Sequence, residues 1–388
     1  MQSFSTSEST HNEQTDSSSS QNSLSNSNKQ KVLSQNQLTT ATTPSTNLRN
    51  LSLSDLFNYL KFSANQVPNS FIDSYKDYMD TTVTVAKGLA ILKMLGFTNY
   101  IIPDVNKTGI INNFDQVNNK GFKLYKDSSS ASIVGTYGAV ESTVLLDSVY
   151  NYELLRPGAI SYLNSKYYNT STIGGFREDF QTNITASIQS TYYAVQALKA
   201  LGYTFSPDQI TKIYAFLQSM WNSQGHYFSN TNDPDLSVFE TTFQSITILY
   251  DLGQTSQQLW SEVASGFPQF VNSNQDKSGV FNGAIHSSNG VANVDDTGSA
   301  LSTLYMLNKL NSVNVTSAIQ FIINSQYNGT AFTKDVGGFS YNNSTQSSLS
   351  QFSGVTLSHT YYAILGLYAT GLRKIVCYYC KKILQHLW

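Results

Sequence analysis

A long-period repeat constrains the fold of this chain more than any other feature. Five copies have an anchor residue, a leucine seven positions later, and a glycine or asparagine eleven positions later, and a sixth copy has Tyr150 and Leu154 at these places. The copies follow one another at roughly 50 residues, a period typical of stacked helical units. The anchors are Val85, Thr143, Thr191, Thr242, Thr297 and Thr360, of which Thr143 starts the most degenerate copy.

The copy that ends at Gly202 shows what one unit contains. It opens with a Gly-Gly-Phe turn at 174–176, continues through a polar loop and then becomes helical near Ser190. Tyr193, Ala197 and Leu201 recur at helical spacing and give that helix one apolar face. Gly202 suits the left-handed residue that often ends a helix.

A second apolar helix precedes the turn in most copies, so each repeat reads as helix, turn, loop and helix. We therefore expect an all-α fold over residues 51–388. Six helical hairpins are enough to close a ring, with one helix of each pair inside and its partner outside. Periodicity alone leaves an open solenoid as the alternative.

Residues 1–48 have a different composition. Of these 48 residues, 33 are Ser, Thr, Asn or Gln, and Phe4 is the only aromatic residue. Such a segment buries too little apolar surface to offset the entropy of ordering it. We expect a disordered tail before the folded domain.

The overall composition excludes several functional classes. Charged residues are 12% of the chain and the formal net charge is −2, so we expect no nucleic-acid partner. No apolar run approaches the ~20 residues that span a bilayer, and the N-terminus lacks the pattern of a secretory signal. Two cysteines do not make a disulfide framework. A cytoplasmic protein is the default expectation.

The repeat resembles a known family. The sequence GGF, a polar loop and TYYAVQALKALG is similar to the β subunits of protein prenyltransferases and to the terpene cyclases. The final copy, GGFSYNNSTQSSLSQFSGVTLSHTYYAILGL, is similar to the end of the prenyltransferase ring. The resemblance covers residues 75–372. It implies an α/α toroid whose inner helices surround a cavity and begin at its mouth.

The resemblance also implies a metal site, at which zinc activates a protein thiol. Its ligands would be Asp296 and His359, but the cysteine of the family falls on Gly298. Thiolate is the softest ligand of such a set. Two remaining ligands are too few for a stable site, so we expect no cofactor, zinc included, unless Asp295 or another side chain helps.

The part of the implied site that would bind the diphosphate also lacks the residues of the family. No Arg or Lys occurs between Asn282 and Val294, where the family has both, and Ser299 and Ser302 replace an aromatic pair. An Asp-rich cyclase motif is absent; the sequences at 233–237 and 294–296 are poor substitutes. Near the C-terminus, Cys377 and Cys380 are expected to be apolar groups of a closing helix.

We therefore expect a non-catalytic toroid, a pseudoenzyme that acts as a binding or scaffold module. The alternative is a divergent protein prenyltransferase β subunit with a helical-repeat α subunit as its partner. An interaction subunit like the toroidal domain of ribophorin II is a third possibility. An isoprenoid or another lipid is the expected small ligand. The tyrosines expected to line its cavity are Tyr192, Tyr193, Tyr361 and Tyr362.

Overall fold

The computed structural model describes ten segments of the chain. They are residues 51–65, 81–96, 110–116, 120–146, 152–178, 185–229, 237–287, 290–329, 335–342 and 354–372. All of them belong to one compact unit, residues 44–388. The predicted disordered tail and the predicted closing helix with Cys377 and Cys380 lie outside the described residues.

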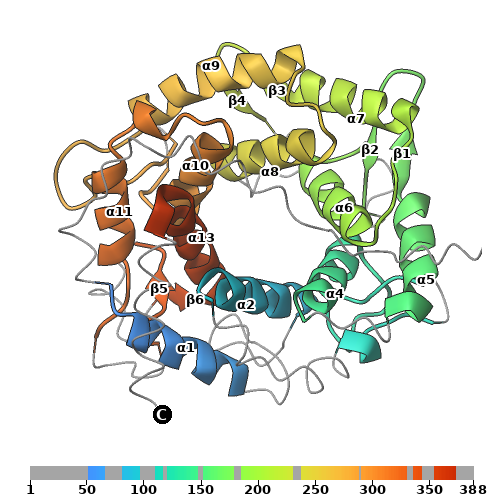
Figure 1. The fold of residues 1–388 in the computed structure, drawn as a ribbon, viewed down its shortest axis with the longest axis horizontal. Coiled ribbons are helices and arrows are strands. Elements are labelled where there is room, and N and C mark those ends of the chain that lie inside the picture. Colours follow the sequence, from blue (N-terminus) through green and yellow to red (C-terminus); the bar gives the residue numbers. More distant parts are fainter. Residues whose placement is uncertain are drawn as a thin grey trace, which may run out of the picture. The chain divides into compact units, whose positions relative to one another are not determined.

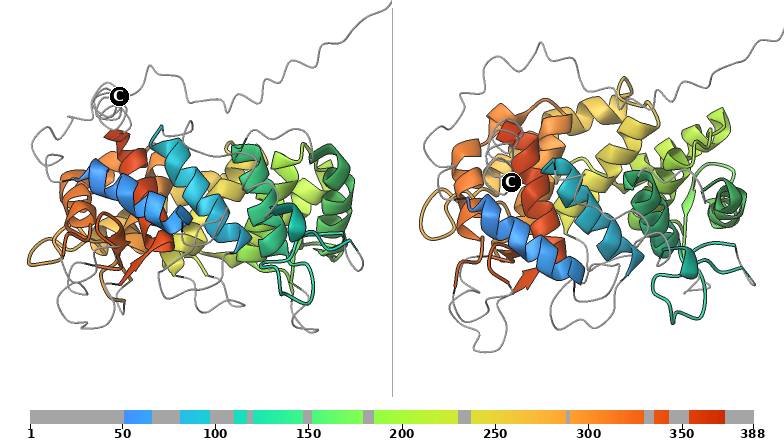
Figure 2. Two further views of the ribbon diagram at one scale, coloured as in Figure 1. Left: turned by 90° about the horizontal axis from the view of Figure 1, so that it is seen from below. Right: turned by 60° about the horizontal axis from the view of Figure 1, so that its bottom comes forward.

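Six helices form the inner ring of the 44–388 unit (Figure 1). They are α2 (Thr82–Met94), α4 (Ile133–Leu145), α6 (Ile188–Ala200), α8 (Val238–Asp251), α10 (Val294–Met306) and α13 (Leu357–Leu367). Each packs against the next, and α13 packs against α2. Figure 2 shows from two other directions that α13 lies beside α2. The ring is therefore closed, as predicted, and the open solenoid is excluded.

The remaining helices lie outside this ring (Figure 1). The described outer helices are α1 (Leu53–Asn65), α5 (Tyr152–Ser165), α7 (Pro207–Met220), α9 (Gln258–Ser273) and α11 (Val315–Asn324). Short turns η4 (Leu310–Ser312) and η5 (Tyr368–Leu372) follow α10 and α13. Aromatic side chains fill the space between the rings: Phe239 of α8 lies 5.1 Å from Phe270 of α9, ring centre to ring centre. Such burial is the main stabilising term of the fold.

Three of the predicted glycine–phenylalanine turns are short antiparallel hairpins. They are β1 (Tyr167–Asn169) with β2 (Gly174–Phe176), β3 (Trp221–Asn222) with β4 (Tyr227–Phe228), and β5 (Phe339–Ser340) with β6 (Val355–Thr356). The phenylalanine of each hairpin is buried, and its backbone N–H donates to an anchor threonine. These bonds join Phe176 to Thr191, Phe228 to Thr242 and Phe339 to Thr360, at 3.0–3.1 Å.

The threonine anchors of these copies thus have a physical role, which is to satisfy a buried backbone N–H of the preceding loop. Ile285 donates in the same way to Thr297 at 3.0 Å. In the copy assigned to Thr143, however, the donor Phe122 bonds to Thr136 at 3.0 Å. The Thr143 hydroxyl donates only to Ala139 of its own helix. The predicted anchor of this copy is therefore wrong by seven residues, and Thr136 takes its place.

We expect Thr136→Val to lower the free energy of unfolding by about 1–2 kcal/mol, because it leaves the buried N–H of Phe122 without an acceptor. Thr143→Val is the matched control, and we expect it to change stability by less than about 0.5 kcal/mol. Chemical denaturation of both variants measures the difference. A larger loss in the Thr143 variant would contradict the corrected register.

The ends of five inner helices were predicted correctly. Positive φ angles, which the C′ position of a helix requires, occur at Gly96, Gly202, Gly253, Asn308 and Gly371. At the other end, Ser, Thr or Asn caps each inner helix, and its side chain accepts a hydrogen bond from a first-turn N–H. Within the described segments, no helix combines the length and apolar character needed to cross a membrane.

Candidate functional site

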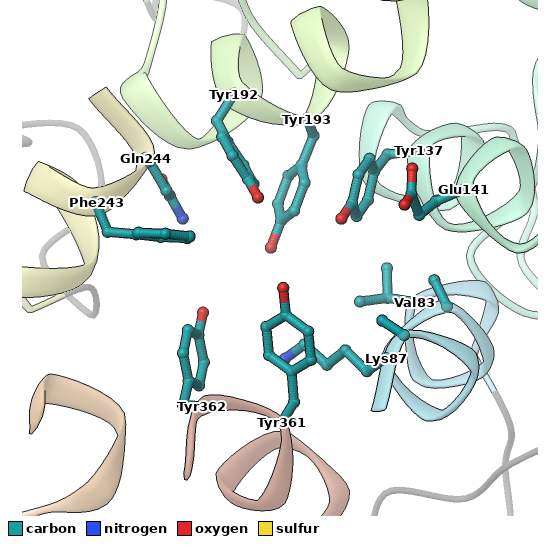
Figure 3. Close-up of a pocket in the computed structure, with 12 residues that line it drawn as sticks. Val83, Lys87, Tyr137, Glu141, Tyr192, Tyr193, Phe243, Gln244, Tyr361 and Tyr362 are labelled. Atoms are coloured by element: carbon teal, nitrogen blue, oxygen red, sulfur yellow. The ribbon is translucent and has the colours of Figure 1, made fainter. Parts of the chain in front are cut away.

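A cavity lies at the centre of the ring, and Figure 3 shows side chains that line it. The space between these side chains measures about 490 Å³, a volume that includes open solvent. Its walls come from five of the six inner helices, all except α10. The lining residues are Val83, Ala86, Lys87, Ala90, Tyr137, Glu141, Tyr192, Tyr193, Phe243, Gln244, Tyr361 and Tyr362. The four tyrosines expected from the sequence are among them.

The lining residues occupy equivalent positions in the sequence repeat. The first two residues after an anchor face the cavity in α2, α6, α8 and α13, and they include Lys87, Tyr193, Gln244 and Tyr362. In α4 the first residue after the corrected anchor is Tyr137, and Glu141 follows one helical turn later. The cavity is therefore built from equivalent positions of successive repeats.

Aromatic rings form one continuous part of the wall. The ring centre of Tyr193 lies 4.8 Å from that of Tyr137 and 5.3 Å from that of Tyr192. Tyr361 and Tyr362 form an edge-to-face pair at 5.3 Å. Burial raises the pKa of Tyr137, Tyr192, Tyr361 and Tyr362 above the usual value, so these phenols stay uncharged near neutral pH. The wall offers ring faces and neutral hydroxyls.

One ammonium group already lies on this wall. The Nζ atom of Lys87 is 5.8 Å from the ring centre of Tyr361 and 5.3 Å from that of Tyr362. It also donates a hydrogen bond to Ser358 Oγ at 3.0 Å. The Tyr362 hydroxyl is hydrogen-bonded to the carboxyl group of Glu240. Burial raises the pKa of Glu240, and the opposing effects of Tyr362 and Lys87 are smaller.

Two polar groups at the cavity have no partner among the described residues. The carboxyl group of Glu141 makes neither a hydrogen bond nor an ion pair with them. Burial raises its pKa, and the charge of Lys93 lowers it by less. The Gln244 side chain is buried, and its Oε1 atom has no hydrogen-bond donor. Both side chains are in Figure 3, on opposite sides of the cavity.

In the structure, His359 pairs with Asp295, the residue before the implied zinc ligand Asp296. The Nδ1 atom of His359 lies 2.9 Å from a carboxylate oxygen of Asp295, not of Asp296. Asp296 is 4% exposed, and its carboxylate accepts a hydrogen bond from Asn293 at 3.0 Å. Neither Asp296 nor His359 lines the central cavity. The Asp296 side chain is therefore buried, not open to solvent.

The close packing around Gly298 explains why a cysteine is missing from this position. A Cβ atom on Gly298 would lie 2.1 Å from the backbone oxygen of Tyr362, far inside contact distance. On the facing helix, a Cβ on Gly366 would lie 2.8 Å from the Cα of Gly298. Helices α10 and α13 therefore pack backbone to backbone and leave no room for a thiol. Among the described residues, no group of three or more His, Cys, Asp or Glu side chains is arranged to hold a metal ion. The residues present do not fit the zinc site of the family.

Sequence reasoning missed five of the polar or aromatic lining residues, among them Phe243, which directly follows the anchor Thr242. The incorrect register in α4 concealed Tyr137 and Glu141. Lys87 and Gln244 were detectable, because each is the second residue after an anchor, like Tyr193 and Tyr362. The repeat itself therefore carried the missing signal.

Comparisons with known proteins agree with this fold. Candida albicans protein geranylgeranyltransferase-I complexed with GGPP is similar in structure, with 16% identity over 76% of this chain and 85% of that chain and a TM-score of 0.59. The type II terpene cyclase MstE from Scytonema is 11% identical over 85% of this chain and 98% of that chain, with a TM-score of 0.53. A variant of MstE in complex with geranylgeranyl dihydroxybenzoate reaches a TM-score of 0.56, with 12% identity over 84% and 99% of the two chains.

Likeness at such low identity shows the fold alone. No curated protein sequence matches the chain. The family model of the prenyltransferase alpha-alpha toroid domain, however, matches residues 51–166 and 154–353, which together make up most of the chain. The protein therefore belongs to the prenyltransferase α/α-toroid domain family.

Proposed function

We propose that the protein is a non-catalytic binding module whose central cavity takes an isoprenoid or a similar lipid without a diphosphate group. The observation that carries this proposal is the composition of the cavity wall, in which five tyrosines and Phe243 surround a single lysine. Ligand sites in proteins are typically concave and mainly apolar, with a few polar groups that orient the ligand. Structurally similar proteins hold GGPP or geranylgeranyl dihydroxybenzoate, so the fold is able to enclose an isoprenoid chain.

The charges at the cavity oppose a diphosphate. Lys87 is the one cationic side chain among the lining residues, which also include Glu141, and Glu240 is hydrogen-bonded to the lining residue Tyr362. A diphosphate needs several cations or helix N-termini to offset its desolvation. Loss of the zinc ligand at Gly298 further supports a binding role over transfer to a thiol.

We expect farnesol to bind about tenfold or more tightly than farnesyl diphosphate, because the unpaired anion has a desolvation cost that Lys87 alone does not offset. Isothermal titration calorimetry of the full chain with both compounds measures the order. Tyr193→Ala should weaken farnesol binding, whereas Tyr250→Ala, an exposed site on α8, should not.

One observation favours a second candidate, a divergent prenyltransferase. Lys87 places an ammonium at the cavity, where a transferase would need a cation for the leaving diphosphate. If this candidate holds, the diphosphate binds more tightly than farnesol, and Lys87→Met abolishes the difference. If neither compound binds, a protein-binding scaffold is the better account and the lipid proposal fails.

A further inference from the structure

Glu141 is the most informative side chain of the cavity that the proposed function leaves unused. It lies one turn after Tyr137 on α4 and takes part in the cavity lining. Its carboxyl group accepts no hydrogen bond from the described residues and has no cation within ion-pair distance among them. The Glu141 side chain is half-buried, so a ligand that supplies a donor would replace water at this carboxyl, and a charged donor would bind it more strongly than a neutral one.

A second unpartnered group points to a ligand as well. Gln244 is 2% exposed, lies on α8 and contributes its amide to the cavity (Figure 3). Its Oε1 atom has no donor among the described residues. Native proteins pair nearly all of their buried polar atoms. Unpaired acceptors on two helices of the same cavity indicate an occupant that carries hydrogen-bond donors.

The aromatic wall suits a cationic donor. The ammonium of Lys87 already rests on the ring faces of Tyr361 and Tyr362, at 5.8 Å and 5.3 Å. Tyr137, which neighbours Glu141, packs at 4.8 Å against Tyr193 and so presents a comparable aromatic surface. Aromatic rings together with a carboxylate are the chemistry by which proteins recognise alkylammonium ions.

The balance of charge leads to the same conclusion. Glu240 has Tyr362 as a hydrogen-bond partner and Lys87 as its nearby cation, whereas the only cation that acts on Glu141 among the described residues is Lys93. Burial raises the pKa of Glu141. A cation bound beside this carboxyl would stabilise its ionised form, and the anion would in turn hold the cation. An anionic head group, by contrast, would meet a like charge.

We propose that the ligand of the central cavity is a long-chain amine, an isoprenoid or lipid whose ammonium head binds the Glu141 carboxylate on the tyrosine wall. This inference rests on the proposed function and adds the chemical class of the head group. The apolar chain of the ligand would occupy the cavity under the proposed function and under this inference. Only the ammonium head group is specific to this inference.

Titration calorimetry with farnesylamine and farnesol tests it, using the full chain and the variants Glu141→Gln and Glu153→Gln. Glu153 is exposed on the outer helix α5, so it controls for the loss of one negative charge. We expect the amine to bind wild-type protein about tenfold or more tightly than the alcohol. Glu141→Gln should weaken amine binding by about tenfold or more and alcohol binding by less than about threefold, whereas Glu153→Gln should change neither.

An amine that binds wild-type protein no more tightly than farnesol would overturn the inference, and so would an equal loss of both ligands in Glu141→Gln. The wild-type comparison needs no variant, so it decides even if the Glu141→Gln protein is unstable. Farnesol binding without a preference for the amine leaves the proposed function intact and refutes only the ammonium head. Absence of binding by both compounds refutes both.

Discussion

Gly298→Cys is expected to destabilise the protein by about 3 kcal/mol, although it restores the residue type that the family's zinc site uses. The new Cβ atom would stand 2.1 Å from the Tyr362 backbone oxygen, and a backbone atom of a packed helix cannot move aside cheaply. Helices α10 and α13 would have to separate. Chemical denaturation measures the loss.

Ser299→Cys is the matched control, because it adds a thiol at the next position of the same helix. Ser299 is buried and its hydroxyl has no partner among the described residues, so we expect a change below about 1.5 kcal/mol. Zinc analysis of purified wild-type protein and of Gly298→Cys should give well below one ion per chain. A stable Gly298→Cys protein with one zinc per chain, lost in His359→Ala, would show that the transferase centre is recoverable.

Asp296→Asn is expected to stabilise the protein at pH 7 by about 2 kcal/mol and to leave its stability at pH 4 nearly unchanged. Burial raises the pKa of Asp296 from 3.8 to about 6, against the opposing hydrogen bonds from Ser237 and Asn293. Between pH 3.8 and about pH 6, the folded state therefore keeps a proton on Asp296 that the unfolded state has already released. Stability falls as the pH rises through this window, by about 1.4 kcal/mol for each unit of the shift.

Burial also raises the pKa of other carboxyl groups, such as Glu240 and Asp251, so the informative quantity is the difference between variant and wild type at each pH. The asparagine side chain is uncharged at every pH and keeps an acceptor for Asn293. Asp295→Asn is the neighbouring control: it removes the partner of His359 and should not stabilise the protein at pH 7. Urea unfolding from pH 4 to 7 provides the curves. A flat difference for Asp296→Asn would contradict the raised pKa.

The fold was predictable because each copy of the repeat contains residues that the ends of a helix and the preceding loop require. Glycine or asparagine marks the helix ends, and a threonine marks the loop N–H that must be satisfied. The register of α4 was not predictable in this way. Thr136 and Thr143 are seven residues apart, nearly two helical turns, and so lie on almost the same face. Only the hydrogen bond from Phe122, in the loop that precedes α4, distinguishes them.

The candidate site was predictable only in part, for a related reason. Tyr192, Tyr193, Tyr361 and Tyr362 follow their anchors directly, so the repeat alone directs them inward. By contrast, the repeat does not indicate whether Asp295 or Asp296 is the partner of His359. Adjacent helical residues point about 100° apart, and the rotation of α10 about its axis decides which one faces α13. That rotation depends on close backbone packing, which a glycine in the sequence permits but does not reveal.

A crystal structure of the full chain grown with farnesol tests the central claim most directly. We expect the prenyl chain to lie in the central cavity, in contact with the rings of Tyr192, Tyr193, Tyr361 and Tyr362. Electron density for the ligand at another place, such as the Asp295–His359 pair, would contradict the account. So would a cavity that stays closed by its own side chains under conditions where calorimetry measures binding.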